Sequence, residues 1–339
     1  MRSIGYVRST AIVACLLCVG SVRAEIYRPR EPIAIGGEGG WDYLTIQSSP
    51  HRLFLSHASR VVVVDLDGKK KTGEFPGAGV HGVALAPELG RAFSTNGKEG
   101  TVSIVDLSTL KVLSKTPTGS NPDAVVYDPT SRNVFAFNGA LPGELSSVTV
   151  IKAATGAVLA TVALPGKPEF AVVDPPAQRI YVNIEDKNSI VALDSKTGKV
   201  LSDWPIGPCE GPSGLALDAG GQRLFSVCEN KLMVAVDAKS GKVVGTAPIG
   251  AGPDGAAFDA DSKLAFSANG EGTVTVVRFS QGALEVVETL RTEPGARTIA
   301  LDPKDHALYL PTAKFDAVKK GERRARPIDG TQKILVYGR

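Results

Sequence analysis

The chain has 339 residues, of which 43% are hydrophobic and 22% charged, with a formal net charge of only +3 at pH 7. So small a net charge argues against nonspecific electrostatic binding to nucleic acid. Aromatic residues make up 6% of the chain, whereas 37 Gly and 22 Pro are spread through it, a composition that favours short strands and turns over long helices.

Residues 1–24 have the features of a secretory signal. Arg2 and Arg8 precede an apolar segment over residues 11–19, and Val22-Arg23-Ala24 offers a cleavage site of small residues. Cleavage would remove three of the 38 basic residues and none of the 35 acidic ones, so the charges of the mature chain balance. We expect a protein of residues 25–339 that is periplasmic or secreted and monomeric.

Residues 1–24 contain two cysteine motifs, and we expect neither lipidation nor redox chemistry from them. Ile12-Val13-Ala14-Cys15 resembles a lipoprotein box, but Cys15 lies within the apolar run rather than at its end. Cys15-Leu16-Leu17-Cys18 matches a redox motif that cleavage would discard. No other segment is long and apolar enough to predict a membrane span.

The rest of the chain repeats a unit of about 42 residues, and its clearest copy is residues 253–290. Runs over 256–258, 264–268, 273–277 and 284–290 are short, rich in Val, Phe and Thr, and separated by turn residues, which predicts four antiparallel strands. Copies spaced 39 to 46 residues apart have their first turns at Asp42, His81, Asp123, Glu169, Ser213, Asp254 and Ala296. Such a period with four strands predicts an all-β, seven-bladed β-propeller.

The two ends of the chain complement each other. Residues 25–35 resemble a fourth strand without the first three, and the last copy, residues 297–337, has three strands and no fourth. We therefore expect the segment 33–35 to pair with 334–337, so that the N-terminal strand completes the C-terminal blade. Residues 25–339 then form one closed domain.

Polar residues gather on one face of the predicted ring, the top, where each first strand begins and each second strand ends. The candidate binding residues on this face are Trp41, Asp42, His57, His81, Asp123, Asn138, Glu169, Glu185, Glu210, Asp254, Arg297 and Lys314. They could bind a ligand, hold a divalent metal or perform acid–base chemistry, or they could simply cap turns that recur with the fold. His57 and His81 stand out because imidazoles replace the usual turn residues. We predict no cofactor, with a divalent metal as the open alternative, and we expect His51 and His306 on the opposite face to be structural.

Two cysteines remain after cleavage, Cys209 and Cys228, in one blade and close to the same face. An oxidising compartment favours a disulfide between them. The alternatives are two free thiols, or a metal site completed by Glu210 or Glu229.

Two further segments invite a functional interpretation. Residues 250–255 match the GxGxxG dinucleotide pattern, but they precede a strand instead of opening a helix, so we reject that assignment. The long loop between residues 310 and 334 is rich in basic residues, namely Lys314, Lys319, Lys320, Arg323, Arg324 and Arg326. It is either a solvated loop or a basic flap over the top face that would suit an anionic ligand.

Several short motifs give the whole mature chain a resemblance to the YVTN-repeat family of bacterial β-propellers, and within it to the YncE-like secreted proteins. The matching motifs are residues 39–43 (GGWDY), 52–57 (RLFLSH), 80–84 (VHGVA), 121–124 (NPDA), 137–139 (FNG), 168–170 (PEF), 208–210 (PCE) and 312–315 (TAKF). The resemblance implies the seven-bladed fold and says little about activity. Nucleic-acid binding has been proposed for family members, and similar seven-bladed folds include lactonases and an antibiotic lyase.

Two classes of function follow from these observations. The first is a binding or scaffolding propeller that holds a small molecule, a peptide or a partner protein at the top of its channel. The second is a lactonase- or lyase-like, metal-assisted enzyme at the same place. We favour binding, because the sequence shows no poised base, and fold alone does not decide function.

Overall fold

The structure is a computed structural model that describes Met1, residues 26–318 and residues 325–339. The predicted signal, apart from Met1, lies outside the described residues. So do Cys15, Cys18 and four basic residues of the long loop, Lys319, Lys320, Arg323 and Arg324.

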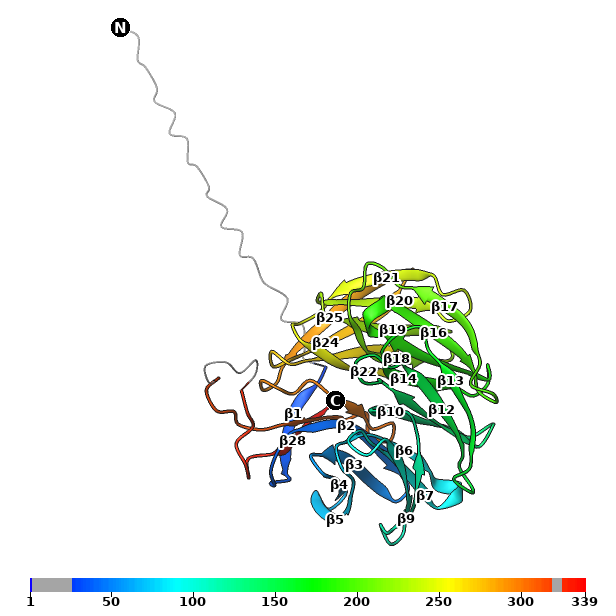
Figure 1. The fold of residues 1–339 in the computed structure, drawn as a ribbon. Coiled ribbons are helices and arrows are strands. Elements are labelled where there is room, and N and C mark those ends of the chain that lie inside the picture. Colours follow the sequence, from blue (N-terminus) through cyan, green and yellow to red (C-terminus); the bar gives the residue numbers. More distant parts are fainter. Residues whose placement is uncertain (2–25, 319–324) are drawn as a thin grey trace.

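The described residues form seven antiparallel sheets of four strands, arranged as blades around a central channel (Figure 1). Blade one contains β2 (Trp41–Ser48), β3 (His51–His57), β4 (Arg60–Asp65) and β5 (Lys70–Pro76). Blade two contains β6 (Val80–Ala86), β7 (Arg91–Asn96), β8 (Thr101–Asp106) and β9 (Val112–Pro117). Blade three contains β10 (Pro122–Asp128), β11 (Asn133–Asn138), β12 (Ser147–Lys152) and β13 (Val158–Ala163). Blade four contains β14 (Pro168–Asp174), β15 (Arg179–Ile184), β16 (Ser189–Asp194) and β17 (Val200–Pro205).

The remaining blades follow the same plan. Blade five contains β18 (Pro212–Asp218), β19 (Arg223–Cys228), β20 (Leu232–Asp237) and β21 (Val243–Pro248). Blade six contains β22 (Pro253–Asp259), β23 (Leu264–Asn269), β24 (Thr273–Ser280) and β25 (Ala283–Arg291). Blade seven contains β26 (Ala300–Leu301), β27 (Leu308–Thr312), β28 (Lys333–Gly338) and β1 (Arg28–Ala34). Short 3₁₀ turns lie at Pro87–Leu89 and Glu185–Lys187. The predicted seven-bladed fold is confirmed.

The N-terminal strand closes the ring, as the missing strands at the two ends predicted. β1 pairs antiparallel with β28, from Arg28 opposite Gly338 to Ile33 opposite Ile334. Within β1 only Ile33 is buried, and it packs into the core between blades seven and one. Just before the strand, buried Tyr27 meets Phe266 edge to face at 5.4 Å between ring centroids. The buried side chains of Tyr27 and Ile33, together with the hydrogen-bonded pairing of β1 with β28, therefore complete blade seven.

Apolar side chains fill the spaces between neighbouring blades. Because successive side chains of a strand point to opposite faces, each central strand contributes to the cores on both sides of its sheet. In blade one, for example, Phe54 and Val63 face blade two, whereas Leu53 and Val62 face blade seven. The near-continuous hydrophobic runs of the second and third strands follow from this double burial.

The expected disulfide joins Cys209 and Cys228, whose Cα atoms lie 5.5 Å apart. Both cysteines are buried. The bond ties the turn before β18 to the end of β19 within blade five. None of the helical segments in the described part of the chain is long and apolar enough to cross a membrane.

Candidate functional site

The first strand of each blade places one side chain at the top of the central channel, a region that we call the mouth. In blades one to six this is the second residue of the strand, and the series is Asp42, His81, Asp123, Glu169, Ser213 and Asp254. In blade seven the position belongs to Arg297 instead of the expected Ala296. Ala296 is fully buried in the core, whereas Arg297 forms an ion pair with Asp254. The repeat thus brings six ionisable side chains from separate blades together.

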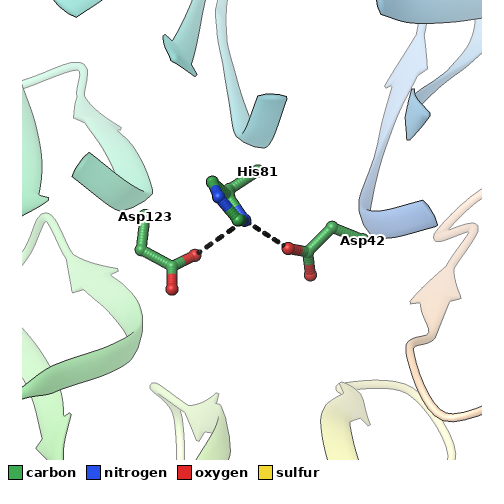
Figure 2. A group of neighbouring side chains, drawn as sticks. All are labelled: Asp42, His81 and Asp123. Atoms are coloured by element: carbon green, nitrogen blue, oxygen red, sulfur yellow. Dashed lines mark hydrogen bonds and ion pairs between the residues drawn. The ribbon is translucent and has the colours of Figure 1, made fainter. Parts of the chain in front are cut away.

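Three of these side chains, from blades one, two and three, form a compact group (Figure 2). The imidazole Nδ1 of His81 lies 2.6 Å from Asp42 Oδ2 and 3.7 Å from Asp123 Oδ1. The nearer carboxylate is a hydrogen-bond partner, and the farther one is an ion-pair partner only. Asp123 Oδ1 is buried and has no hydrogen bond from any described residue. We call Asp42, His81 and Asp123 the triad.

Crowding of the two carboxylates perturbs the protonation of the triad. The hydrogen bond to Asp42 raises the pKa of His81, and the charge of Asp123 adds to this effect while burial opposes it. Burial, together with the negative charge of Asp42, raises the pKa of Asp123 to about 7. Asp123 is therefore a carboxyl group whose negative charge is poorly compensated by its surroundings.

A second polar group lies at the blade-four side of the mouth. Lys167 Nζ is 2.6 Å from Glu169 Oε1 and 2.5 Å from Glu185 Oε2. Burial and the charge of Asp123 raise the pKa of Glu169, although its bond with Lys167 acts in the other direction. Sequence reasoning missed Lys167 because it lies two residues before the anchor Glu169. Its position just ahead of the Pro168-Glu169 turn was the available signal.

Two hollows with common wall residues lie at the mouth. The larger, of about 880 Å³, is lined by Trp41, Asp42, His81 and Arg297 among others. The smaller, of about 490 Å³, is an apolar slot between Trp41, Pro294, Phe315 and Pro327, and it shares Trp41 and Arg297 with the larger one. The rings of Trp41 and Phe315 meet at 60° with 6.0 Å between centroids. A polar hollow therefore adjoins an apolar one at these two residues.

Beneath the mouth, aromatic rings cross the channel. Tyr43 of blade one contacts Phe170 of blade four edge to face, with 5.0 Å between centroids. At least two blades separate these strands on either side of the ring, so the pair spans the central channel. Burial, and then the charge of Asp123, raises the pKa of Tyr43 well above its usual value. The mouth therefore lies above this pair of rings, which also line a hollow of about 910 Å³ further along the channel.

Four predicted binding residues do not reach the mouth. Asn138 is buried and donates to Ser147 and Thr149 of the next strand, at 3.0 Å each. His57 occupies the equivalent ladder position in blade one and is only 1% exposed. Burial and the charge of Arg60 lower the pKa of His57. Glu210 and Lys314 are exposed outside the hollows of the mouth.

The position of His57 explains why the sequence pattern misled. Asn96 and Asn269 end the second strands of blades two and six in the same way, and their amides also bond hydroxyl groups of the following strand. The residue that ends the second strand in these blades is thus buried and is not exposed at the mouth. Glu185 comes one residue later than this position, and it reaches Lys167.

The first and last parts of the basic loop are described, and they flank the apolar slot. A short bridge pairs Phe315 with Pro327, and the backbone N–H of Asp316 donates to the carbonyl of Arg326 at 2.9 Å. Four of the basic residues that suggested a flap lie outside the described residues, so that interpretation stays a prediction.

A scan of the chain against models of protein families finds no match, and a search of curated proteins finds no significantly similar relative. The geometry of the mouth therefore carries the functional argument.

Proposed function

We propose that the protein is a binding propeller whose ligand occupies the mouth, with a positively charged part in the polar hollow and an apolar part in the slot. The observation that carries this proposal is that Trp41 and Arg297 line both the polar hollow and the apolar slot. Binding sites typically combine apolar walls with a few convergent polar groups in this way.

The charge of the mouth supports a ligand that brings positive charge. Its carboxylates are Asp42, Asp123, Glu169, Glu185 and Asp254, and its basic groups are His81, Lys167 and Arg297. Glu99 and Lys98 also line the polar hollow, so six acidic groups face four basic ones. Since the side chains of Asp42, Asp123 and Glu169 are largely buried, this excess is only partly screened by water. A cationic group would offset it, whereas an anion would add to the repulsion.

We also propose that the protein is exported and belongs to the YVTN-repeat propellers. The disulfide between Cys209 and Cys228 supports export, because such bonds persist in oxidising compartments. The seven four-stranded blades support the family proposal at the level of the fold only.

One observation favours a catalytic alternative, a lactonase- or lyase-like enzyme. Asp42 orients the imidazole of His81 through a 2.6 Å hydrogen bond, as a carboxylate does for a general base. The same bond raises the pKa of His81 and so favours its protonated form, in which it cannot accept a proton. Binding therefore remains the better-supported function.

A ligand screen tests the proposal. Purified protein kept in a chelator would be screened by thermal shift against primary amines, guanidines and carboxylic acids, each with and without an aromatic group. We expect aromatic amines or guanidines to give the largest shifts. A buried hydrogen-bonded contact contributes about 1–3 kcal/mol. Asp42→Asn, which removes a carboxylate from the wall of the polar hollow, and Trp41→Leu should therefore each weaken the best hit by about tenfold or more.

The matched control is Asp261→Asn, which changes an exposed carboxylate at the other end of the blades. This control should leave affinity unchanged. The proposal fails if carboxylic acids give the largest shifts, or if the best hit binds both mouth variants as tightly as it binds the unaltered protein.

A further inference from the structure

We propose that the triad is a binding site for a divalent transition-metal ion, with Asp42 Oδ2, His81 Nδ1 and Asp123 Oδ1 as its protein ligands. The inference rests on the proposed function in one respect, since it identifies one source of the positive charge that the mouth is expected to take up.

The three ligand atoms are already gathered. All of them lie within 4.8 Å of one another, and His81 Nδ1 is 2.6 Å from one carboxylate oxygen and 3.7 Å from the other. At bond lengths of about 2.0–2.2 Å, neighbouring ligands of one ion lie roughly 3.0–3.4 Å apart. Side-chain shifts of about an ångström or less per residue would therefore place the ion between the three residues. Figure 2 shows the imidazole between the two carboxylates, which come from blades on either side of it.

A second observation points to a missing partner. Asp123 Oδ1 is a buried atom that accepts no hydrogen bond from the described residues, and it is the oxygen that faces His81. Buried carboxylate oxygens are normally satisfied by donors or by a cation. A bound ion would supply the partner that the protein does not, and it would remove the repulsion between Asp42 and Asp123.

The other cluster of potential ligands in the described structure lacks this feature. Asp259, Asp261 and His306 also gather, at the opposite face. There, however, both carboxylate oxygens of Asp259 already accept hydrogen bonds, from the Asp261 backbone and the Ser262 hydroxyl. The side chain of Asp261 is 80% exposed. That cluster therefore serves as an internal control.

The donor set identifies the class of metal. One imidazole with two carboxylates suits Zn²⁺, Mn²⁺ or Fe²⁺ better than Ca²⁺, which takes oxygen ligands. Three protein ligands leave at least one coordination position, and the larger hollow borders two of the three residues. Since Nδ1 must be unprotonated to bind the ion, the ion and the hydrogen-bonded proton are alternatives at this nitrogen.

Zinc titration tests the inference. Protein stripped with chelator and dialysed free of it would be titrated with Zn²⁺ by calorimetry at pH 7.5, without any organic ligand. We expect one high-affinity site. Asp123→Asn and His81→Gln, which preserve side-chain size, should each weaken it by about 100-fold or more. Asp261→Asn and His306→Gln should leave it unchanged. Thermal denaturation with chelator present would establish that each variant is folded.

Substitution with Co²⁺ provides an independent readout, because its visible absorption reports nitrogen and oxygen ligation directly. This absorption should be present in the unaltered protein and absent from Asp123→Asn. The inference is overturned if no site binds Zn²⁺ more tightly than about 100 µM, or if the triad variants bind it as the unaltered protein does. The two proposals fail separately, since the ligand screen uses protein in chelator and the zinc titration uses no organic ligand.

Discussion

Ring closure can be tested through a single side chain, Ile33. It is the one buried residue of β1, with 2% of its surface exposed, and it packs among Leu44, Leu55 and Ile334 between blades seven and one. Replacing it with Ala removes three methyl or methylene groups and leaves a cavity, which together cost about 2–5 kcal/mol. That loss is a large part of the stability of an ordinary protein. We expect Ile33→Ala to lower the free energy of unfolding by about 3 kcal/mol.

The matched control is Glu31→Ala on the same strand, where the side chain is exposed and the cost should stay within about 0.5 kcal/mol. Urea denaturation followed by circular dichroism measures both variants, and proteolysis shows whether the N-terminal strand is released. Equal stabilities for Ile33→Ala and Glu31→Ala would refute the idea that packing of β1 holds the ring closed. Deleting residues 26–36 should have a larger effect than either, because it also removes the strand ladder and Tyr27.

Two further predictions concern stability. Cys209 and Cys228 are 19 residues apart, and a crosslink closing such a loop stabilises a protein by roughly 3 kcal/mol in the chain-entropy model. Denatured, unreduced protein of residues 25–339 should titrate with no free thiol, and Cys228→Ser should unfold at lower urea concentration; two free thiols would contradict the pairing. On the opposite face, His51 bonds both Asp67 and Asp302, which raise its pKa although burial opposes them. Because the folded pKa is the higher one, this stabilisation is complete below the unfolded pKa of about 6.5 and is lost as pH rises through the folded value. His51→Gln should therefore lose about 1–3 kcal/mol at pH 5.5 and much less at pH 9, and an equal loss at both pH values would contradict the linkage.

The fold was predictable because the sequence features that indicate it are local and are repeated in every blade. Strand-length apolar runs and turn residues recur with a period near 42, and neither signal depends on distant contacts. Closure by the N-terminal strand followed from counting strands at the two ends. The disulfide followed from two cysteines in one blade.

The candidate site was predictable only in part, because a shift of one residue along a strand decides whether a side chain lies at the mouth or is buried between the blades. Asp42, His81 and Asp123 were recognised as candidates, but their contact depends on how three blades pack side by side. His57 and Asn138 were placed on the same face and proved to be buried ladder residues. No period in the sequence distinguishes these positions, since both recur once per blade.

The contrast between Ser213 and Asp123 shows why the triad calls for a functional explanation. Both occupy the same position at the start of a first strand. The Ser213 hydroxyl donates to the carbonyl of Pro253 in the next blade at 3.1 Å, so a small neutral side chain satisfies the fold there. Asp123 instead buries a carboxylate oxygen without a donor, at a cost of about 1–3 kcal/mol, beside a second carboxylate. Because Ser213 shows that a neutral side chain is sufficient at this position, we expect a neutral residue in place of Asp123 to raise the free energy of unfolding. Asp123 lowers the stability of the fold at a position where Ser213 of another blade does not. Such a loss is expected at a functional site, where a bound ligand or ion offsets it. We therefore expect a ligand or ion to bind the mouth at blades one to three.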